Sequence, residues 1–313
     1  MSDKPATPSS SEEPPTAPPS GDTSPAESPA EKRPMSNLAL RLLTAAVLAP
    51  LIVALLFWEQ KAGFLVVIYL AALLCANELG AMVVPGSPLQ RAWLAFGSMA
   101  VLTSVYASGV FALAPSVLTA TVSAVVLIGF TLVLFQRGPV AGADRSMAWV
   151  VAGPFYVGGL LGTIALLHQA PNGGGWVLLA MFFAFLSDTG AYFAGRFLGK
   201  HRLYEKVSPK KTVEGAFGGL AGASFGAALA HFWFLPELPL SHGIPLAILA
   251  AAVGQMGDLY ASLIKRSSGT KDSGQILPGH GGMLDRIDAL FFTGAIVWAY
   301  VEFGACAGHC AFR

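Results

Sequence analysis

The stretch that decides the fold runs from residue 255 to residue 290 and reads QMGDLYASLIKRSSGTKDSGQILPGHGGMLDRIDAL. It starts within an apolar segment, passes into a polar loop and returns to a second apolar segment, and it carries four Asp, two Lys, two Arg and one His. An ionised side chain at the centre of a membrane helix costs about 2.5 to 3.5 kcal/mol on insertion scales. Asp258 and Asp288 therefore indicate a functional site at the boundary of a membrane.

Helical spacing groups the polar residues of this stretch on shared faces. One stripe of the first apolar helix collects, at intervals of three or four residues, Gln255, Asp258, Ser262 and Lys265. Asp285 and Asp288 share a face at the start of the next helix. Asp258 can then converge with both, and clustered carboxylates repel each other unless a hard cation lies between them. We predict that these three hold Mg²⁺, with a second cation left open; structural ion pairs are the alternative.

The polar loop supplies positive charge and glycine next to these carboxylates. Side chains of the type that binds phosphate are Lys265, Arg266, Lys271 and Arg286. Gly279, Gly281 and Gly282 allow a backbone to approach an anion closely. The residues by themselves predict a metal-assisted phosphate site at a lipid boundary.

Two segments of the chain resemble the phosphatidate cytidylyltransferases, also called CDP-diacylglycerol synthases. In the first, the matching positions are Ser262, Lys265-Arg266, Lys271-Asp272, Pro278, His280-Gly281-Gly282, Asp285-Arg286 and Asp288. So many specified positions in one segment make the match more specific than a short motif. The second segment, 187–219, is similar to another block of the family through Ser187-Asp188-Thr189 and Ser208-Pro209-Lys210-Lys211-Thr212.

The resemblance implies roles for residues in both segments. Catalytic roles are implied for Lys265, Arg266, Asp272, His280 and Arg286. Substrate binding is implied for Ser187, Asp188, Arg196, Ser208, Lys210, Lys211, Ser262 and Lys271. By its own residues, 208–212 predicts a phosphate-binding turn at a helix start, in which Pro209 fixes the turn and Thr212 caps the helix. A Lys-rich loop that only anchors the topology is the alternative.

The composition of the chain is typical of a polytopic membrane protein. Of its 313 residues 54% are apolar and 12% are charged, whereas an ordinary soluble domain carries about 25% charged residues. Apolar runs predict nine spans, at 38–58, 62–84, 92–113, 115–136, 147–168, 175–198, 213–235, 244–264 and 286–304. The third and fourth spans are separated only by the turn signal Ala114-Pro115-Ser116. We therefore expect an all-α, polytopic integral membrane protein.

Residues 1–36 are rich in Pro and Ser and predict a disordered tail, followed by one transmembrane domain over 37–313 whose catalytic motifs lie in 187–219 and 255–288. Most Lys and Arg fall in alternate loops, so the positive-inside rule places the N-terminus and the polar loops on the cytoplasmic side. Asp188 and Asp258 then lie at similar depth, which predicts a polar cavity open to the cytosol and sideways to lipid. Glu78, near the cytoplasmic end of the second span, either supports this cavity or faces interfacial water.

The resemblance implies that the protein transfers a cytidylyl group from CTP to phosphatidate, giving CDP-diacylglycerol and pyrophosphate for phospholipid biosynthesis. It implies a multi-pass protein of the inner membrane with its site facing the cytosol; no nucleic-acid partner is expected, and a homodimer is left open. A CTP-dependent polyprenol kinase or another membrane lipid phosphotransferase is the alternative. An anion transporter is a weaker alternative, because its site would be expected at the bilayer midplane between internal repeats.

Overall fold

The structure is a computed structural model that describes residues 37–136, 140–274 and 281–305. The tail over 1–36, for which disorder is predicted, and the predicted catalytic residue His280 lie outside these ranges. The elements in chain order are α1 (Asn37–Leu56), α2 (Ala62–Val83), α3 (Pro88–Val110), α4 (Pro115–Leu134), α5 (Ala143–Pro154), the π-helical turn η1 (Phe155–Gly159), α6 (Leu160–Gln169), α7 (Gly173–Phe197), β1 (Arg202–Tyr204), β2 (Ser208–Thr212), α8 (Val213–Trp233), α9 (Leu240–Ser267), α10 (Leu284–Ala299) and the π-helical turn η2 (Tyr300–Ala305).

Eight helical segments in the described part of the chain are long and apolar enough to cross a membrane. They are Ala62–Val83, Pro88–Val110, Pro115–Leu134, Ala143–Gln169, Gly173–Phe197, Val213–Trp233, Leu240–Ser267 and Leu284–Gly304. These segments coincide with the second to ninth predicted spans, so the polytopic helical membrane protein is confirmed. The first predicted span corresponds to α1, in which the side chains described form the shorter apolar segment Ala46–Leu56. The count of nine spans and the cytoplasmic N-terminus stay predictions.

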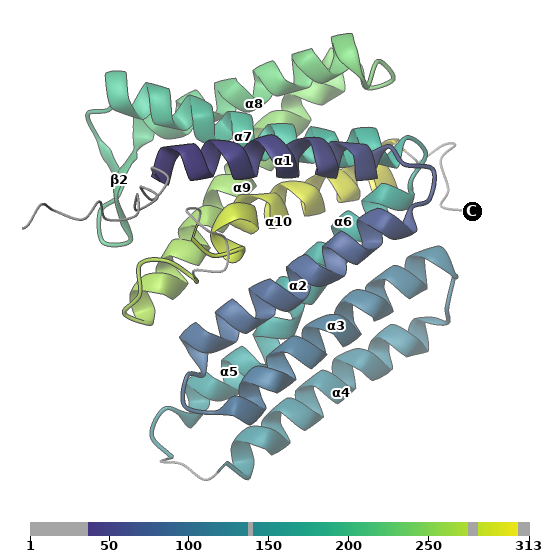
Figure 1. Cartoon of the computed structure of the whole chain (residues 1–313), viewed down its shortest axis with the longest axis vertical. Helices are drawn as coiled ribbons and strands as arrows, with labels where there is room; N and C mark the ends of the chain where they lie inside the picture. The colour runs from purple at the N-terminus through teal and green to yellow at the C-terminus, as the bar shows by residue number, and fades with distance from the viewer. Residues whose placement is uncertain (1–36, 137–139, 275–280, 306–313) are drawn as a thin grey trace, which may run out of the picture. The chain divides into compact units, whose positions relative to one another are not determined.

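The turn predicted between the third and fourth spans is confirmed. Helix α3 ends at Val110, and α4 begins at Pro115. Proline suits the first position of a helix because its missing N–H would have no partner there in any case. The chain thus reverses direction within a few residues, and α3 packs against both α2 and α4, which lie side by side with it in Figure 1.

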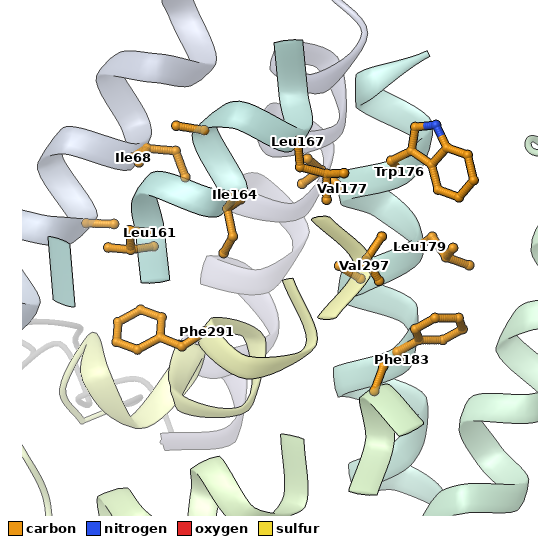
Figure 2. Packing of buried hydrophobic residues seen from close by; sticks show 14 of the residues in the cluster. Ile68, Leu161, Ile164, Leu167, Trp176, Val177, Leu179, Phe183, Phe291 and Val297 are labelled. Carbon is orange, nitrogen blue, oxygen red and sulfur yellow. The ribbon is translucent and has the colours of Figure 1, made fainter. Parts of the chain in front are cut away.

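The apolar core lies where α2, α6, α7 and α10 meet. Figure 2 shows Ile164 of α6 beside Val177 of α7 and Val297 of α10, all of them buried. Large apolar side chains also remain exposed on the outer faces of the helices, among them Val66, Leu127 and Phe225. An apolar surface of this extent is typical of a protein whose outer helix faces contact lipid.

Helices α7 and α8 approach each other closely enough for their backbones to touch. A Cβ atom added to Gly222 of α8 would collide with the carbonyl oxygen of Leu186 in α7, and one added to Gly190 of α7 would collide with that of Gly218. Small residues at four-residue spacing allow this approach. The glycines spaced four residues apart in α8 therefore account for the close packing of these two helices.

Strands β1 and β2 form an antiparallel hairpin between α7 and α8, with Arg202 opposite Thr212 and Tyr204 opposite Ser208. The prediction of a turn over 208–212 is therefore wrong, because the segment is extended. Pro209 fits an edge strand as well as a turn, since the ribbon has only one partner strand. The predicted helix cap is confirmed: the Thr212 hydroxyl accepts a hydrogen bond from the Gly215 amide at 3.1 Å.

Candidate functional site

A cavity of about 370 Å³ with several charged side chains in its wall lies among α7, the hairpin, α8 and α9. Its charged and polar lining residues are Asp188, Tyr192 and Arg196 of α7, Lys210, Lys211 and Thr212 of β2, and Gln255 and Asp258 of α9. Asp188, Tyr192 and Arg196 are spaced four residues apart on α7 and all face the cavity, and the Arg196 guanidinium donates to the Tyr192 hydroxyl at 2.8 Å. The structure thus brings five of the predicted site residues to one space: Asp188, Arg196, Lys210, Lys211 and Asp258.

An ion pair crosses this cavity from the hairpin to α9. The Lys211 ammonium lies 2.5 Å from Oδ2 of Asp258, and each side chain is 27% exposed. The other carboxylate oxygen of Asp258 faces the Ser262 hydroxyl at 3.5 Å, one helical turn further along α9. Because both charges remain partly open to the cavity, an incoming anion can reach Lys211 and an incoming cation can reach Asp258.

Gln255 joins α9 to α7 and α8 by hydrogen bonds at the wall of the cavity. Its amide nitrogen donates to the Ser187 hydroxyl at 3.3 Å and to the carbonyl oxygen of Ala216 at 3.1 Å. Ser187 is only 3% exposed and does not line the cavity. The structure therefore places Ser187 behind the cavity wall, where it holds Gln255; its predicted role in substrate binding stays a prediction.

A second polar cluster surrounds the start of α10. The Lys265 ammonium lies 2.5 Å from Oδ1 of Asp285, and both side chains are nearly buried. The other oxygen, Oδ2, accepts hydrogen bonds from the amide of Ser273 at 2.8 Å and from its hydroxyl at 3.0 Å. Asp285 therefore has partners on both carboxylate oxygens, in contrast to Asp258.

Glu78 of α2 completes this second cluster. Its carboxylate accepts from the Ser273 hydroxyl at 2.9 Å and from the amides of Met283 and Leu284 at 2.8 and 2.9 Å. With 4% of its surface exposed, Glu78 does not face interfacial water, so that alternative is wrong. It does not line the cavity either, and a supporting role stays a prediction. Sequence reasoning missed Ser273 altogether. The one signal for Glu78 was its position as an acid within an apolar span.

Asp288 connects the two clusters. It is buried, its Oδ1 accepts from the amide of Ala289 at 2.7 Å, and its charge interacts with those of Asp258, Asp188 and Lys265. The carboxylate of Asp188 in turn interacts with Asp258 and Lys211. Of the three predicted metal ligands, Asp258 and Asp288 thus lie within range of each other, together with Asp188.

Within the ranges that the structure describes, no group of three His, Cys, Asp or Glu side chains is close enough together to hold a metal ion. Mg²⁺ is commonly held by one or two carboxylates together with substrate phosphates and water, so a complete protein cage is not required. The chemistry of Asp258 and Asp288, acidic oxygens that repel each other beside a cavity, fits such an ion. The metal assignment itself stays a prediction.

The other predicted residues lie around these clusters. Arg266 is exposed and donates to the carbonyl oxygen of Thr270 at 3.4 Å. Lys271 and Asp272 are exposed in the loop that leads to Ser273, and Arg286 is exposed on the first turn of α10. Ser208 lies at the start of β2, outside the cavity lining. The roles of these residues stay predictions.

Comparison with known proteins identifies the family. The model of the cytidylyltransferase family matches residues 39–304. The chain is 41% identical over 154 residues to the phosphatidate cytidylyltransferase of Brucella suis, which covers 49% of this chain and 56% of that protein. It is 41% identical over 138 residues to the enzyme of that name from Staphylococcus saprophyticus, covering 44% of this chain and 52% of that protein. The chain spans about half the length of these relatives. Because the family model extends over most of the sequence and contains both polar clusters, this chain belongs to the cytidylyltransferase family.

Proposed function

We propose that this protein transfers the cytidylyl group of CTP to phosphatidate, giving CDP-diacylglycerol and pyrophosphate. The observation that carries the proposal is the cavity in which Arg196, Lys210 and Lys211 face Asp188 and Asp258 on helices that can cross a membrane. Basic side chains of this kind bind phosphate oxygens. Membership of the cytidylyltransferase family and the names of the relatives support the same reaction.

The reaction needs positioning and charge neutralisation more than proton transfer. A phosphate oxygen of the lipid attacks the α-phosphorus of CTP, the bond to the bridging oxygen breaks, and pyrophosphate leaves with its electron pair. Because the attacking oxygen is already an anion, the protein has to overcome repulsion between two charged substrates and hold them in line. Cations held in the wall of a cavity are well suited to that task.

The ion pair between Lys211 and Asp258 offers a direct way to bind CTP together with a metal ion. A phosphate oxygen of CTP takes the place of Asp258 as the partner of Lys211, which frees the carboxylate. Asp258 and Asp288 would then hold Mg²⁺ together with phosphate oxygens, and the ion would neutralise charge on the departing pyrophosphate. Lys265 keeps its pairing with Asp285 and lies within charge range of Asp288.

We infer a location in the inner membrane with the cavity facing the cytosol. The hairpin between α7 and α8 and the segment between α9 and α10 leave the membrane domain on the same side, because each follows a span that runs in the same direction. The hairpin is rich in Lys and Arg. Lys271 lies in the second segment, and Lys265 and Arg266 lie in the last turn of α9 just before it; the positive-inside rule assigns such residues to the cytoplasm.

Labelled CTP separates the proposed reaction from its closest alternative. Purified protein is incubated with phosphatidate, a polyprenol and Mg²⁺, once with CTP labelled at the α-phosphate and once with CTP labelled at the γ-phosphate, and the lipid fraction is analysed by thin-layer chromatography. Cytidylyl transfer puts only the α-label into the lipid. A polyprenol kinase would put the γ-label into a polyprenol and leave phosphatidate unchanged; that result would replace the proposal.

A further inference from the structure

We propose that Glu78 of α2 is a positioning residue for this reaction: its carboxylate sets the place of Asp285 and the start of α10 through Ser273, Met283 and Leu284. The inference rests on the proposed function and deepens it. Glu78 lies almost two hundred residues before the polar stretch that it holds, as the sequence separation of 195 between Glu78 and Ser273 shows.

The donors that Glu78 binds come from both ends of the loop between α9 and α10. Ser273 lies at the end where the loop leaves α9, whereas Met283 and Leu284 lie where α10 begins. The first amides of a helix have no partner within the helix, and a carboxylate is a strong acceptor for them. Glu78 thus supplies from α2 the cap that α10 lacks in its own sequence, since Met283 provides no capping side chain.

The glycines of the loop leave room for this carboxylate. A Cβ atom added to Gly282 would lie 2.6 Å from Oε2 of Glu78, and one added to Gly274 would lie 2.7 Å from Oε1. Both distances are too short for a real side chain, so the backbone at these positions is shaped around Glu78. The sequence predicts that the backbone at Gly282 approaches an anion. In the structure, that anion is the carboxylate of Glu78.

Burial alone does not account for an acid at this position. Cys75, one helical turn before Glu78, and Leu79, the next residue along the helix, are completely buried and already join α2 to the core. An apolar side chain would be less costly to bury there than a charged one. The presence of a carboxylate at this buried position is therefore explained by its hydrogen bonds to the segment that carries Asp285.

Ser273 links Glu78 to Asp285 by hydrogen bonds. Its hydroxyl lies 2.9 Å from Glu78 and 3.0 Å from Asp285, but it has one hydrogen to donate. Its amide donates to Asp285 in addition. When a substrate or an ion binds Asp285, the Ser273 hydroxyl can donate its hydrogen to Glu78 alone. The hydrogen bond from the Ser273 amide then still holds Asp285 in place. Glu78 acts on the reaction only through these groups.

Glu78→Gln tests the inference because it keeps the size of the side chain. Whichever way the new amide turns, its NH₂ group faces a backbone N–H, of Met283 in one orientation and of Leu284 in the other. We expect kcat to fall about tenfold to a hundredfold, the range for one hydrogen bond to a charged group. The KM for CTP should change less than twofold, because the cavity of Lys211 is untouched. Glu59→Gln, the same change at an exposed acid of the preceding loop, should match wild type.

Two further measurements separate positioning from a loss of folding. Amide hydrogen exchange in the peptide that contains Met283 and Leu284 should be faster in Glu78→Gln and unchanged in Glu59→Gln. Ser273→Ala, which leaves the buried acid in place, should lower kcat in the same direction by a smaller factor. The effects of Glu78→Gln and Ser273→Ala should be less than additive, because both break one network.

The inference is overturned if the Glu78→Gln protein folds and has the kcat of wild type. If that variant does not fold, a wild-type kcat in Ser273→Ala overturns the inference instead. It is also overturned if kcat falls only in proportion to the folded fraction measured by thermal unfolding in detergent. A wild-type protein that makes no CDP-lipid would refute the proposed function instead, and the exchange measurement would still show whether Glu78 holds the start of α10.

Discussion

Replacing Asp258 with asparagine removes one negative charge from the cavity without changing the size of the side chain. Asp258 pairs with Lys211 at 2.5 Å, yet both side chains are 27% exposed. A pair this open to solvent contributes about 1 kcal/mol or less to the free energy of unfolding. The lysine left behind is not a buried charge either. We therefore expect the Asp258→Asn protein to fold and to unfold at nearly the wild-type temperature.

The effect on turnover should be far larger. A carboxylate that holds a cation against the developing charge of the leaving group contributes about 3 to 4 kcal/mol to the transition state. Its loss lowers kcat by a factor of hundreds to about a thousand. The measurement is steady-state kinetics against CTP and against phosphatidate, with thermal unfolding in detergent for the same samples.

Asp144→Asn is the matched control, since Asp144 is an exposed acid in the first turn of α5 and does not line the cavity. It should keep wild-type turnover. Near-normal kcat in Asp258→Asn would refute the argument that this carboxylate acts on the transferred phosphate, even if the CDP-lipid is still made.

Three other results are expected. Excess chelator should abolish turnover and added Mg²⁺ should restore it, because Asp258 and Asp288 repel each other without a cation; full activity in chelator would contradict this. Lys211→Ala should raise the KM for CTP more than it lowers kcat, because a lysine on an outer phosphate oxygen contributes mainly to ground-state binding; an unchanged KM would remove Lys211 from the nucleotide site. A cysteine placed at Lys206 in the hairpin should react with a membrane-impermeant reagent only from the cytosolic side, and labelling from outside would reverse the topology.

The helices and the faces of their polar residues could be predicted because both depend on local periodicity. Asp188, Tyr192 and Arg196 recur every four residues, and a helix necessarily places them together. The turn before Pro115 was predictable for the same reason, since proline marks a helix start locally.

Contacts between distant segments could not be predicted in this way. The pairing of β2 with β1 depends on which segment lies beside it, and Pro209 is compatible with a turn and with a strand. Asp285 was expected beside Asp258 because both lie on predicted faces, but spacing does not show that Lys265 and Ser273 already bind both of its oxygens. The role of Glu78 likewise depends on the approach of α2 to the start of α10.

The backbone contact between α7 and α8 restricts where this protein can move. Helices that touch at Gly190 and Gly222 can neither slide past each other nor separate without losing close packing along their whole length. Asp188 lies on one of these helices, and Lys211 lies two residues before the other begins. That wall of the cavity therefore behaves as one rigid body. Under the proposed function, we expect the widening that admits a lipid or releases a product to come from the opposite wall, which α9 forms.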